Sequence, residues 1–136
     1  MNYYIIIPAY NEEQFIELTL QSIVNQTILP KKVVVVDDNS TDKTFEIAEK
    51  YAEKLSYISA VKTNSEAVHL PGSKVIKAFN KGLSQLDDEY DVIVKLDADL
   101  ILPLNYFETI LNHFKSDDKI GMVGGFCYIQ KNGDWI

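Results

Sequence analysis

The sequence of 136 residues contains no arginine: its 13 basic residues are all lysines, set against 20 acidic residues, and the net charge is −7. A chain without a basic face is a poor nucleic-acid binder, so that class of function is excluded. Without a guanidinium group, no side chain can clamp a phosphate in a bidentate manner. If such an acidic chain binds a diphosphate, it needs a divalent cation to offset the repulsion, with lysines as additional point charges.

Cysteines and histidines are also few, and glycine-rich nucleotide-binding motifs are absent. The single cysteine, Cys127, excludes an internal disulfide and fits a reducing compartment, where we expect it to be a small buried hydrophobic residue. His69 and His113 lack the spacing of zinc ligands. The six glycines form neither a phosphate loop nor a G-x-G-x-x-G fingerprint, which argues against kinases, nucleoside triphosphatases and NAD enzymes.

Long apolar runs are absent as well. The run of valines at 33–36 is far too short to cross a bilayer, and no basic region precedes the apolar residues 3–7 as it would in a signal peptide. These observations predict a cytoplasmic protein. The hydrophobic content of 46% supports a packed core, and the length suits one domain.

What is present is an alternation of short β-rich runs with longer helical periods. The pattern predicts strands at 3–7, 32–36, 56–61, 91–96 and 121–130, and helices at 12–26, 39–55, 73–86 and from Pro103 to Phe114. The third of these helices carries the apolar residues Val75, Ile76, Phe79, Leu83 and Leu86, and Asn132-Gly133 is a turn signal. We expect Pro8 to end the first strand. This order of elements predicts an α/β domain with a mostly parallel sheet, covered on both faces.

Ligands of such sheets bind beyond the carboxyl ends of the strands. Three polar clusters fall there, at residues 8–13, 37–41 and 97–99. Because the carboxyl ends of parallel strands meet at one edge of the sheet, we expect the three clusters to converge.

The pair Asp97 and Asp99 is the most informative of these features. Side chains alternate along an extended strand, so the two carboxylates should face the same side. Two neighbouring like charges are unfavourable unless a cation or a proton lies between them. A polar turn before Pro103 is the simpler interpretation, but we favour a cation or sugar-nucleotide site.

The other two clusters offer groups suited to a nucleoside. Asp38 can accept a hydrogen bond from a ring N–H such as that of uracil, whereas Asp37 is more simply explained as a cap of the next helix. Tyr10 has a flat face on which a base can stack. Glu12 can accept from ribose or base, or, with Asn11, simply favour the positive end of the following helix.

Two lysines, Lys74 and Lys77, lie at the start of the third predicted helix. They either contact a diphosphate at the helix N-terminus or belong to a solvated face of the helix. The sequence leaves both interpretations open.

Together, the segments IPAYNEE (7–13), VDDNSTD (36–42) and LDAD (96–99) resemble the family 2 glycosyltransferases in order and spacing. The resemblance covers essentially the whole chain. It implies the GT-A fold, a Rossmann-like three-layer sandwich, and a nucleotide-diphosphate sugar donor, usually a UDP-sugar. It also implies a Mn²⁺ or Mg²⁺ ion, inversion at the anomeric carbon, and a role in building cell-envelope polysaccharide.

The resemblance assigns a role to each matching position. By position, Pro8, Ala9, Tyr10 and Glu12 would line the nucleoside pocket, Asp38 would bond the base, Asp97 would contact the ribose or sugar, and Asp99, with Asp97, would hold the metal. Ala98 in the third motif and Lys74, which lies in a segment that resembles the family only loosely, are also expected to bind the nucleotide sugar. Members of this family are longer, and their catalytic base is a carboxylate well beyond the third motif. We therefore expect residues 1–136 to be a donor-binding portion, with the base beyond Ile136 and the glycan, lipid or protein acceptor unspecified.

Three other classes of function are weighed against this one. A nucleotidyltransferase would carry a glycine-rich, basic loop after the first strand, and residues 8–13 are neither. In a phosphoacceptor signalling domain the acidic pair follows the first strand, whereas here it follows the second. A binding module that holds a nucleotide sugar without turning it over stays open.

Overall fold

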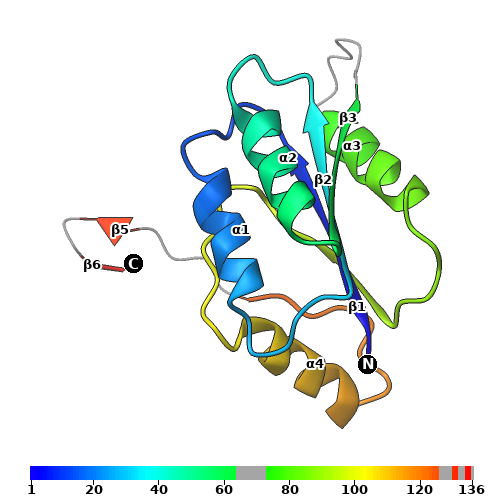
Figure 1. The fold of residues 1–136 in the computed structure, drawn as a ribbon. Helices are drawn as coiled ribbons and strands as arrows, with labels where there is room; N and C mark the ends of the chain where they lie inside the picture. The colour runs from blue at the N-terminus through cyan, green and yellow to red at the C-terminus, as the bar shows by residue number, and fades with distance from the viewer. Residues whose placement is uncertain (64–72, 126–129, 132–133, 136) are drawn as a thin grey trace.

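The computed structural model describes residues 1–63, 73–125, 130–131 and 134–135 (Figure 1). The elements are β1 (Tyr3–Ala9), α1 (Ile16–Val24), β2 (Lys32–Asp38), α2 (Thr44–Lys54), β3 (Ile58–Thr63), α3 (Ser73–Ser84), β4 (Val92–Lys95), α4 (Tyr106–Ser116), β5 (Gln130–Lys131) and β6 (Asp134–Trp135). The sequence predictions for His69, Cys127 and the turn at Asn132-Gly133 lie outside the described residues. No helix in the described ranges has the length and apolar character needed to span a membrane.

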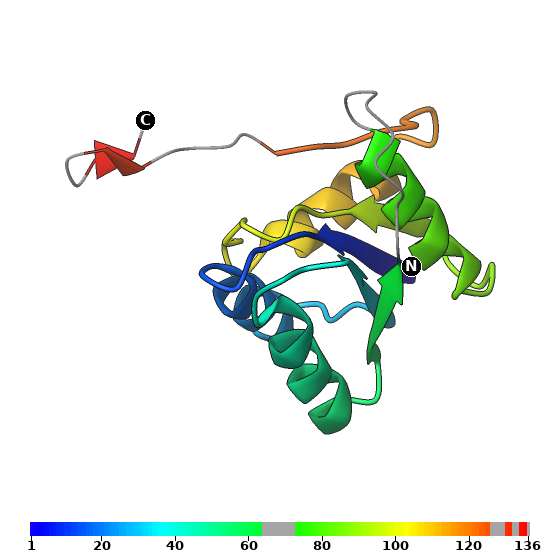
Figure 2. The ribbon, with the colours of Figure 1, turned by 90° about the horizontal axis from the view of Figure 1, so that it is seen from above.

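The main sheet has four parallel strands in the order β3-β2-β1-β4, and β5 and β6 form a separate antiparallel pair. Figure 2 shows α2 and α3 on opposite sides of the sheet. Parallel neighbours need a crossover, and each crossover here carries a helix that covers one face. The predicted α/β architecture is confirmed.

The core is divided by the sheet into two layers. On one face, Ile5, Ile7, Val33 and Val35 pack with α1, α2 and α4; on the other, Ile6, Val34 and Val36 pack with α3. Alternate residues of a strand point to opposite faces, so a central strand covered on both sides must be apolar at every position. This arrangement explains the uninterrupted isoleucine and valine runs.

Pro8 does not end the first strand, contrary to the sequence prediction. β1 continues to Ala9, and Pro8 is in register with Val36 of β2. Ile6 accepts a hydrogen bond from Leu96 on the β4 side, and Pro8, two residues on, presents its backbone to that same side. Because the pairing of β1 with β4 ends at Ile6, the N–H that proline lacks is not needed.

Several helix and strand boundaries also differ from the predictions. Residues 12–15 form a turn, so α1 begins at Ile16, and α4 begins at Tyr106, after Pro103. In α3 the buried residues are Ala78 and Gly82, whereas Val75 and Ile76 are 41% and 61% exposed. A strand was predicted at 121–130, but residues 121–125 do not form a strand. Apolar periodicity located each helix but placed the starts of α1, α2 and α4 too early.

The connection between α3 and β4 is tied to the sheet through one carboxylate. Tyr4 Oη donates to Asp87 Oδ1 at 2.5 Å, and Lys32 Nζ lies 2.6 Å from Asp87 Oδ2. The hydrogen bond from Lys32, followed by the one from Tyr4, holds the pKa of Asp87 well below its usual value. The charged form of Asp87 is therefore favoured by folding.

Replacing Asp87 with asparagine should lower the free energy of unfolding at neutral pH. A carboxylate whose pKa is depressed in the folded state stabilises the fold above its unfolded pKa, about 4, and loses that contribution as the pH falls further. The difference in the free energy of unfolding between wild type and Asp87→Asn should thus shrink below about pH 4. Urea unfolding at pH 7, 5 and 3 measures it, and a difference that does not change with pH would contradict this assignment.

Candidate functional site

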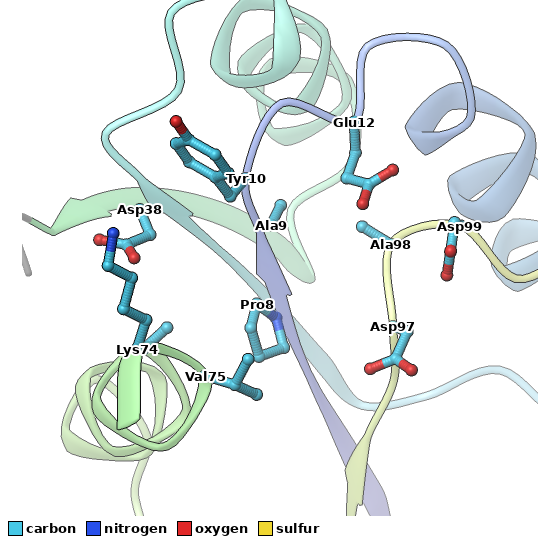
Figure 3. A pocket seen from close by; sticks show the side chains of 11 residues that line it. Pro8, Ala9, Tyr10, Glu12, Asp38, Lys74, Val75, Asp97, Ala98 and Asp99 are labelled. Carbon is cyan, nitrogen blue, oxygen red and sulfur yellow. The ribbon is translucent and has the colours of Figure 1, made fainter. Parts of the chain in front are cut away.

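A cavity of about 440 Å³ opens where β1 and β2 end and where the chain leaves β4 (Figure 3). It lies at the carboxyl ends of parallel strands, where open α/β sheets bind their ligands, and it has the size of a small-molecule site. Its lining includes the nine residues expected to bind the nucleotide sugar or its metal: Pro8, Ala9, Tyr10, Glu12, Asp38, Lys74, Asp97, Ala98 and Asp99. The expected convergence of the three clusters is therefore what the structure has.

Two lining residues, Val75 and Ala78, were missed as site residues. They are three positions apart on α3 and share a helix face with each other. The sequence pattern counted Val75 only among the apolar residues of the third predicted helix, because apolar periodicity does not distinguish a residue that lines a cavity from one in the core. Lys77, by contrast, is exposed and is not among the lining residues.

Tyr10 and Lys74 lie on one side of the cavity. The Tyr10 ring is 55% exposed, and Lys74 Nζ lies 5.9 Å from its centroid. Figure 3 shows the Lys74 side chain extending from α3 toward Asp38, away from Asp97 and Asp99. A positive charge, an aromatic face and a carboxylate thus meet at this end of the cavity.

The two aspartates of the second cluster are both buried but do different things. Asp38 lines the cavity, whereas Asp37 does not. Asp37 Oδ2 accepts from Ser40 N at 3.3 Å, and its Oδ1 has no hydrogen-bond partner among the described residues. The group at the start of α2 is instead Asp42, which accepts from Thr44 N at 2.9 Å. The prediction that Asp37 caps α2 is therefore wrong: it closes the turn before α2.

Asp97 and Asp99 follow β4 rather than lying on it, because the strand ends at Lys95. The alternation nevertheless continues past the strand: Leu96 and Ala98 are buried, and Asp97 and Asp99 are exposed. Two hydrogen bonds hold this extension in place, Leu96 N to Ile6 O at 3.0 Å and Thr19 Oγ1 to Ala98 O at 2.9 Å. The two carboxylates thus face outward from an anchored backbone, and Asp97 Oδ1 lies 3.0 Å from Lys95 Nζ.

Negative charge accumulates on this side of the cavity. Burial, followed by repulsion from Asp99, Asp42 and Asp97, raises the pKa of Glu12. In Figure 3 the carboxylates of Glu12, Asp97 and Asp99 lie on the opposite side of the cavity from Lys74. A cation placed here would relieve the repulsion among these groups.

The residues fit a cation that is shared with a ligand rather than enclosed by protein. Within the described ranges, no group of three or more His, Cys, Asp or Glu side chains is arranged to hold a metal ion. Ions such as Mg²⁺ are commonly held by one or two carboxylates together with the phosphates of a substrate. The exposed pair Asp97 and Asp99 supplies that donor set.

Comparison with known proteins gives relatives of one kind. The chain is 41% identical over 101 residues to the poly(ribitol-phosphate) β-N-acetylglucosaminyltransferase TarS of Staphylococcus aureus. The match covers 71% of this chain and 16% of TarS. It is 32% identical over 114 residues to the cholesterol galactosyltransferase of Borreliella burgdorferi, covering 84% of this chain and 29% of that protein.

Solved structures agree with the fold. TarS residues 1–349 in complex with UDP match with a TM-score of 0.68 at 31% identity, over 85% of this chain and 32% of that one. The mannosyltransferase PcManGT of Pyrobaculum calidifontis, in complex with GDP-Man and Mn²⁺, matches with a TM-score of 0.70 at 26% identity, over 88% and 34%. The chain therefore spans about a third or less of the length of these proteins.

The fold class expected from the sequence, a Rossmann-like GT-A arrangement with a parallel sheet, is thus confirmed. Residues 4–136 match the model of the family described as glycosyl transferase family 2. The match covers nearly the whole chain and includes every residue that lines the cavity. On these grounds, the chain belongs to glycosyl transferase family 2.

Proposed function

We propose that residues 1–136 form the donor-binding portion of an inverting glycosyltransferase, which holds a nucleoside diphosphate sugar together with a divalent cation. The observation that carries this proposal is the meeting of nine predicted residues, from four separate segments, around one cavity. Similar proteins support it: TarS is solved with UDP and with UDP-GlcNAc, and PcManGT with GDP-Man and Mn²⁺. A UDP-sugar is the donor that we favour.

The base belongs, in this proposal, at the end of the cavity formed by Tyr10 and Asp38, and the ribose between that end and Glu12. The exposed Tyr10 ring offers a stacking face, and the Asp38 carboxylate accepts a hydrogen bond from a ring N–H. Lys74 adds the positive charge that the chain cannot supply through arginine. Pro8 and Ala9 form the wall between these groups and the acidic side (Figure 3).

The diphosphate and sugar belong at the acidic side. Asp99, with Asp97, would hold the Mn²⁺ or Mg²⁺ ion, which as a Lewis acid would offset the charge that develops on the departing diphosphate. Glu12 accepts hydrogen bonds from the ribose hydroxyl groups. Hydroxyl groups carry no negative charge, so they can donate to this carboxylate although neighbouring carboxylates repel it. Ala98 contributes a small side chain that lets the sugar approach the backbone.

Transfer itself would be a direct displacement. The acceptor oxygen bonds to the anomeric carbon on the face opposite the diphosphate, the bond to the diphosphate breaks, and a base takes the hydroxyl proton. We assign no base within residues 1–136, so we expect this chain alone to show little or no transfer. A glycan, lipid or protein acceptor, a cell-envelope product and a cytoplasmic location stay predictions.

Calorimetric titration with UDP, with and without Mn²⁺, tests the proposal. We expect binding that strengthens at least tenfold when Mn²⁺ is present, because the ion screens the diphosphate from an acidic site. GDP serves as the second nucleotide. If neither nucleotide diphosphate binds in a metal-dependent manner, the proposal fails. An assay for hydrolysis or transfer of a UDP-sugar then separates a working enzyme from a binding module.

A further inference from the structure

The two loops that border the nucleotide side of the cavity are joined to each other. Six hydrogen bonds connect them: Asn11 N to Ser40 Oγ (2.9 Å), Thr41 N to Asn11 Oδ1 (2.8 Å), Thr41 Oγ1 to Asn11 Oδ1 (3.4 Å), Glu12 N to Thr44 Oγ1 (2.8 Å), Glu13 N to Asp42 Oδ2 (3.2 Å) and Lys43 N to Glu13 Oε2 (3.1 Å). One loop follows β1 and the other follows β2. The two loops are therefore held against each other.

Asn11 is the residue at the centre of this connection. Its backbone donates to the second loop and its side chain accepts from it. It also has a φ of 50°, in the left-handed region that asparagine tolerates better than most residues. Asn39, in the facing loop, has a φ of 58°.

The neighbours of Asn11 on either side, Tyr10 and Glu12, both line the cavity, but Asn11 itself does not. A left-handed residue between them fixes the directions in which the two side chains leave the backbone. The hydrogen bond from Thr41 N holds that left-handed turn against the β2 loop, next to Asp38.

We infer that Asn11 is a positioning residue of the nucleotide site, holding the Tyr10 ring and the Glu12 carboxylate in place through its left-handed backbone and its Oδ1. The inference rests on the proposed function. The contribution of Asn11 to overall stability is small, because its bond to Thr41 N is exposed and water can replace it. Its effect is on geometry, which water cannot restore.

Three substitutions of Asn11 separate the contribution of its left-handed backbone from that of its Oδ1 acceptor. Asn11→Asp keeps both the tolerance of positive φ and an acceptor oxygen. Asn11→Gly keeps only the backbone freedom, and Asn11→Ala keeps neither. Asn112→Ala, an exposed asparagine on α4 and outside the cavity, is the matched control.

The probes are UDP with Mn²⁺ and inorganic pyrophosphate with Mn²⁺, each titrated by calorimetry. For UDP we expect Asn11→Asp and Asn112→Ala to stay within about twofold of wild type. Asn11→Gly should bind about fivefold more weakly, as for the loss of the Oδ1 acceptor, and Asn11→Ala at least tenfold more weakly. Pyrophosphate affinity should stay within about twofold throughout, because Asp97 and Asp99 lie on another segment.

The pyrophosphate probe distinguishes positioning from general damage to the fold. A parallel loss of UDP and pyrophosphate affinity in Asn11→Gly, or UDP affinity equal to wild type in both Asn11→Gly and Asn11→Ala, would overturn the inference. If Asn11→Asp binds UDP as weakly as Asn11→Gly, the role assigned to the Oδ1 acceptor is overturned. If wild type binds no nucleotide diphosphate with Mn²⁺, the proposed function itself fails, which is a separate result.

Discussion

Replacing Asp99 with asparagine should abolish the gain in UDP affinity that Mn²⁺ provides, weakening metal-dependent binding about 100-fold, or ~2.7 kcal/mol. Asparagine keeps the shape and an oxygen of the side chain but removes its charge. An ion held by only one or two carboxylates and a diphosphate depends strongly on each of them. Calorimetric titration of the variant with UDP, with and without Mn²⁺, measures the effect.

The same substitution at Asp97 should weaken metal-dependent binding less, about tenfold. Asp97 Oδ1 already lies 3.0 Å from Lys95 Nζ, so part of its charge is compensated. Asp88→Asn, an exposed aspartate in the connection before β4, is the control and should bind like wild type. Equal metal-dependent binding by wild type and Asp99→Asn would show that the ion, if it binds, is held elsewhere.

The site was predictable from the sequence because it depends on a rule of topology rather than on tertiary detail. Parallel strands end at one edge, so polar residues after β1, β2 and β4 had to converge, and Tyr10, Asp38 and Asp99 do so. Val75 and Ala78 were not predictable as lining residues. Ala78 belongs to the apolar core as well as to the cavity lining, and apolar periodicity does not distinguish these two roles.

The hydrogen bonds between the loops after β1 and β2 could not be predicted from the sequence either. Ser40, Thr41 and Asp42 are typical helix-capping residues, and a cap satisfies their side chains locally. In the structure, Ser40 accepts from the backbone of the other loop, and Thr41 donates its N–H to Asn11. Asp42 does both, since its Oδ1 accepts locally from Thr44 N and its Oδ2 accepts from Glu13 N of the other loop. A single sequence does not show which of two nearby backbones a short polar side chain will choose.

Pro8 illustrates the limit of a local rule. Proline disfavours a strand because it lacks a donor, but that matters only where a neighbour needs the donor. The extent of pairing between β1 and β4 decides the outcome, and that is a property of the sheet rather than of the residue.

Replacing Gly82 with alanine should destabilise the fold by about 2 kcal/mol. A Cβ at this position would lie 2.6 Å from Ile6 Cγ2 and 3.0 Å from Val36 Cγ2. Both methyl groups belong to buried β-branched side chains with little freedom at χ1, so α3 itself must shift away from the sheet. The cost exceeds the gain of about 1 kcal/mol that alanine normally brings to a helix.

Urea unfolding measures this loss, and Gly121→Ala is its matched control. A Cβ at Gly121 meets nothing within 4 Å, so that variant should be unchanged or slightly more stable. In a double-mutant cycle with Ile6→Ala, the combined loss should be smaller than the sum of the single losses, because removing the Ile6 methyl groups makes room for the new Cβ. Additive losses, or a Gly82→Ala protein as stable as wild type, would contradict the close packing of α3 on β1. Because α3 also carries Lys74, Val75 and Ala78, the same shift should weaken UDP binding in protein that is still folded.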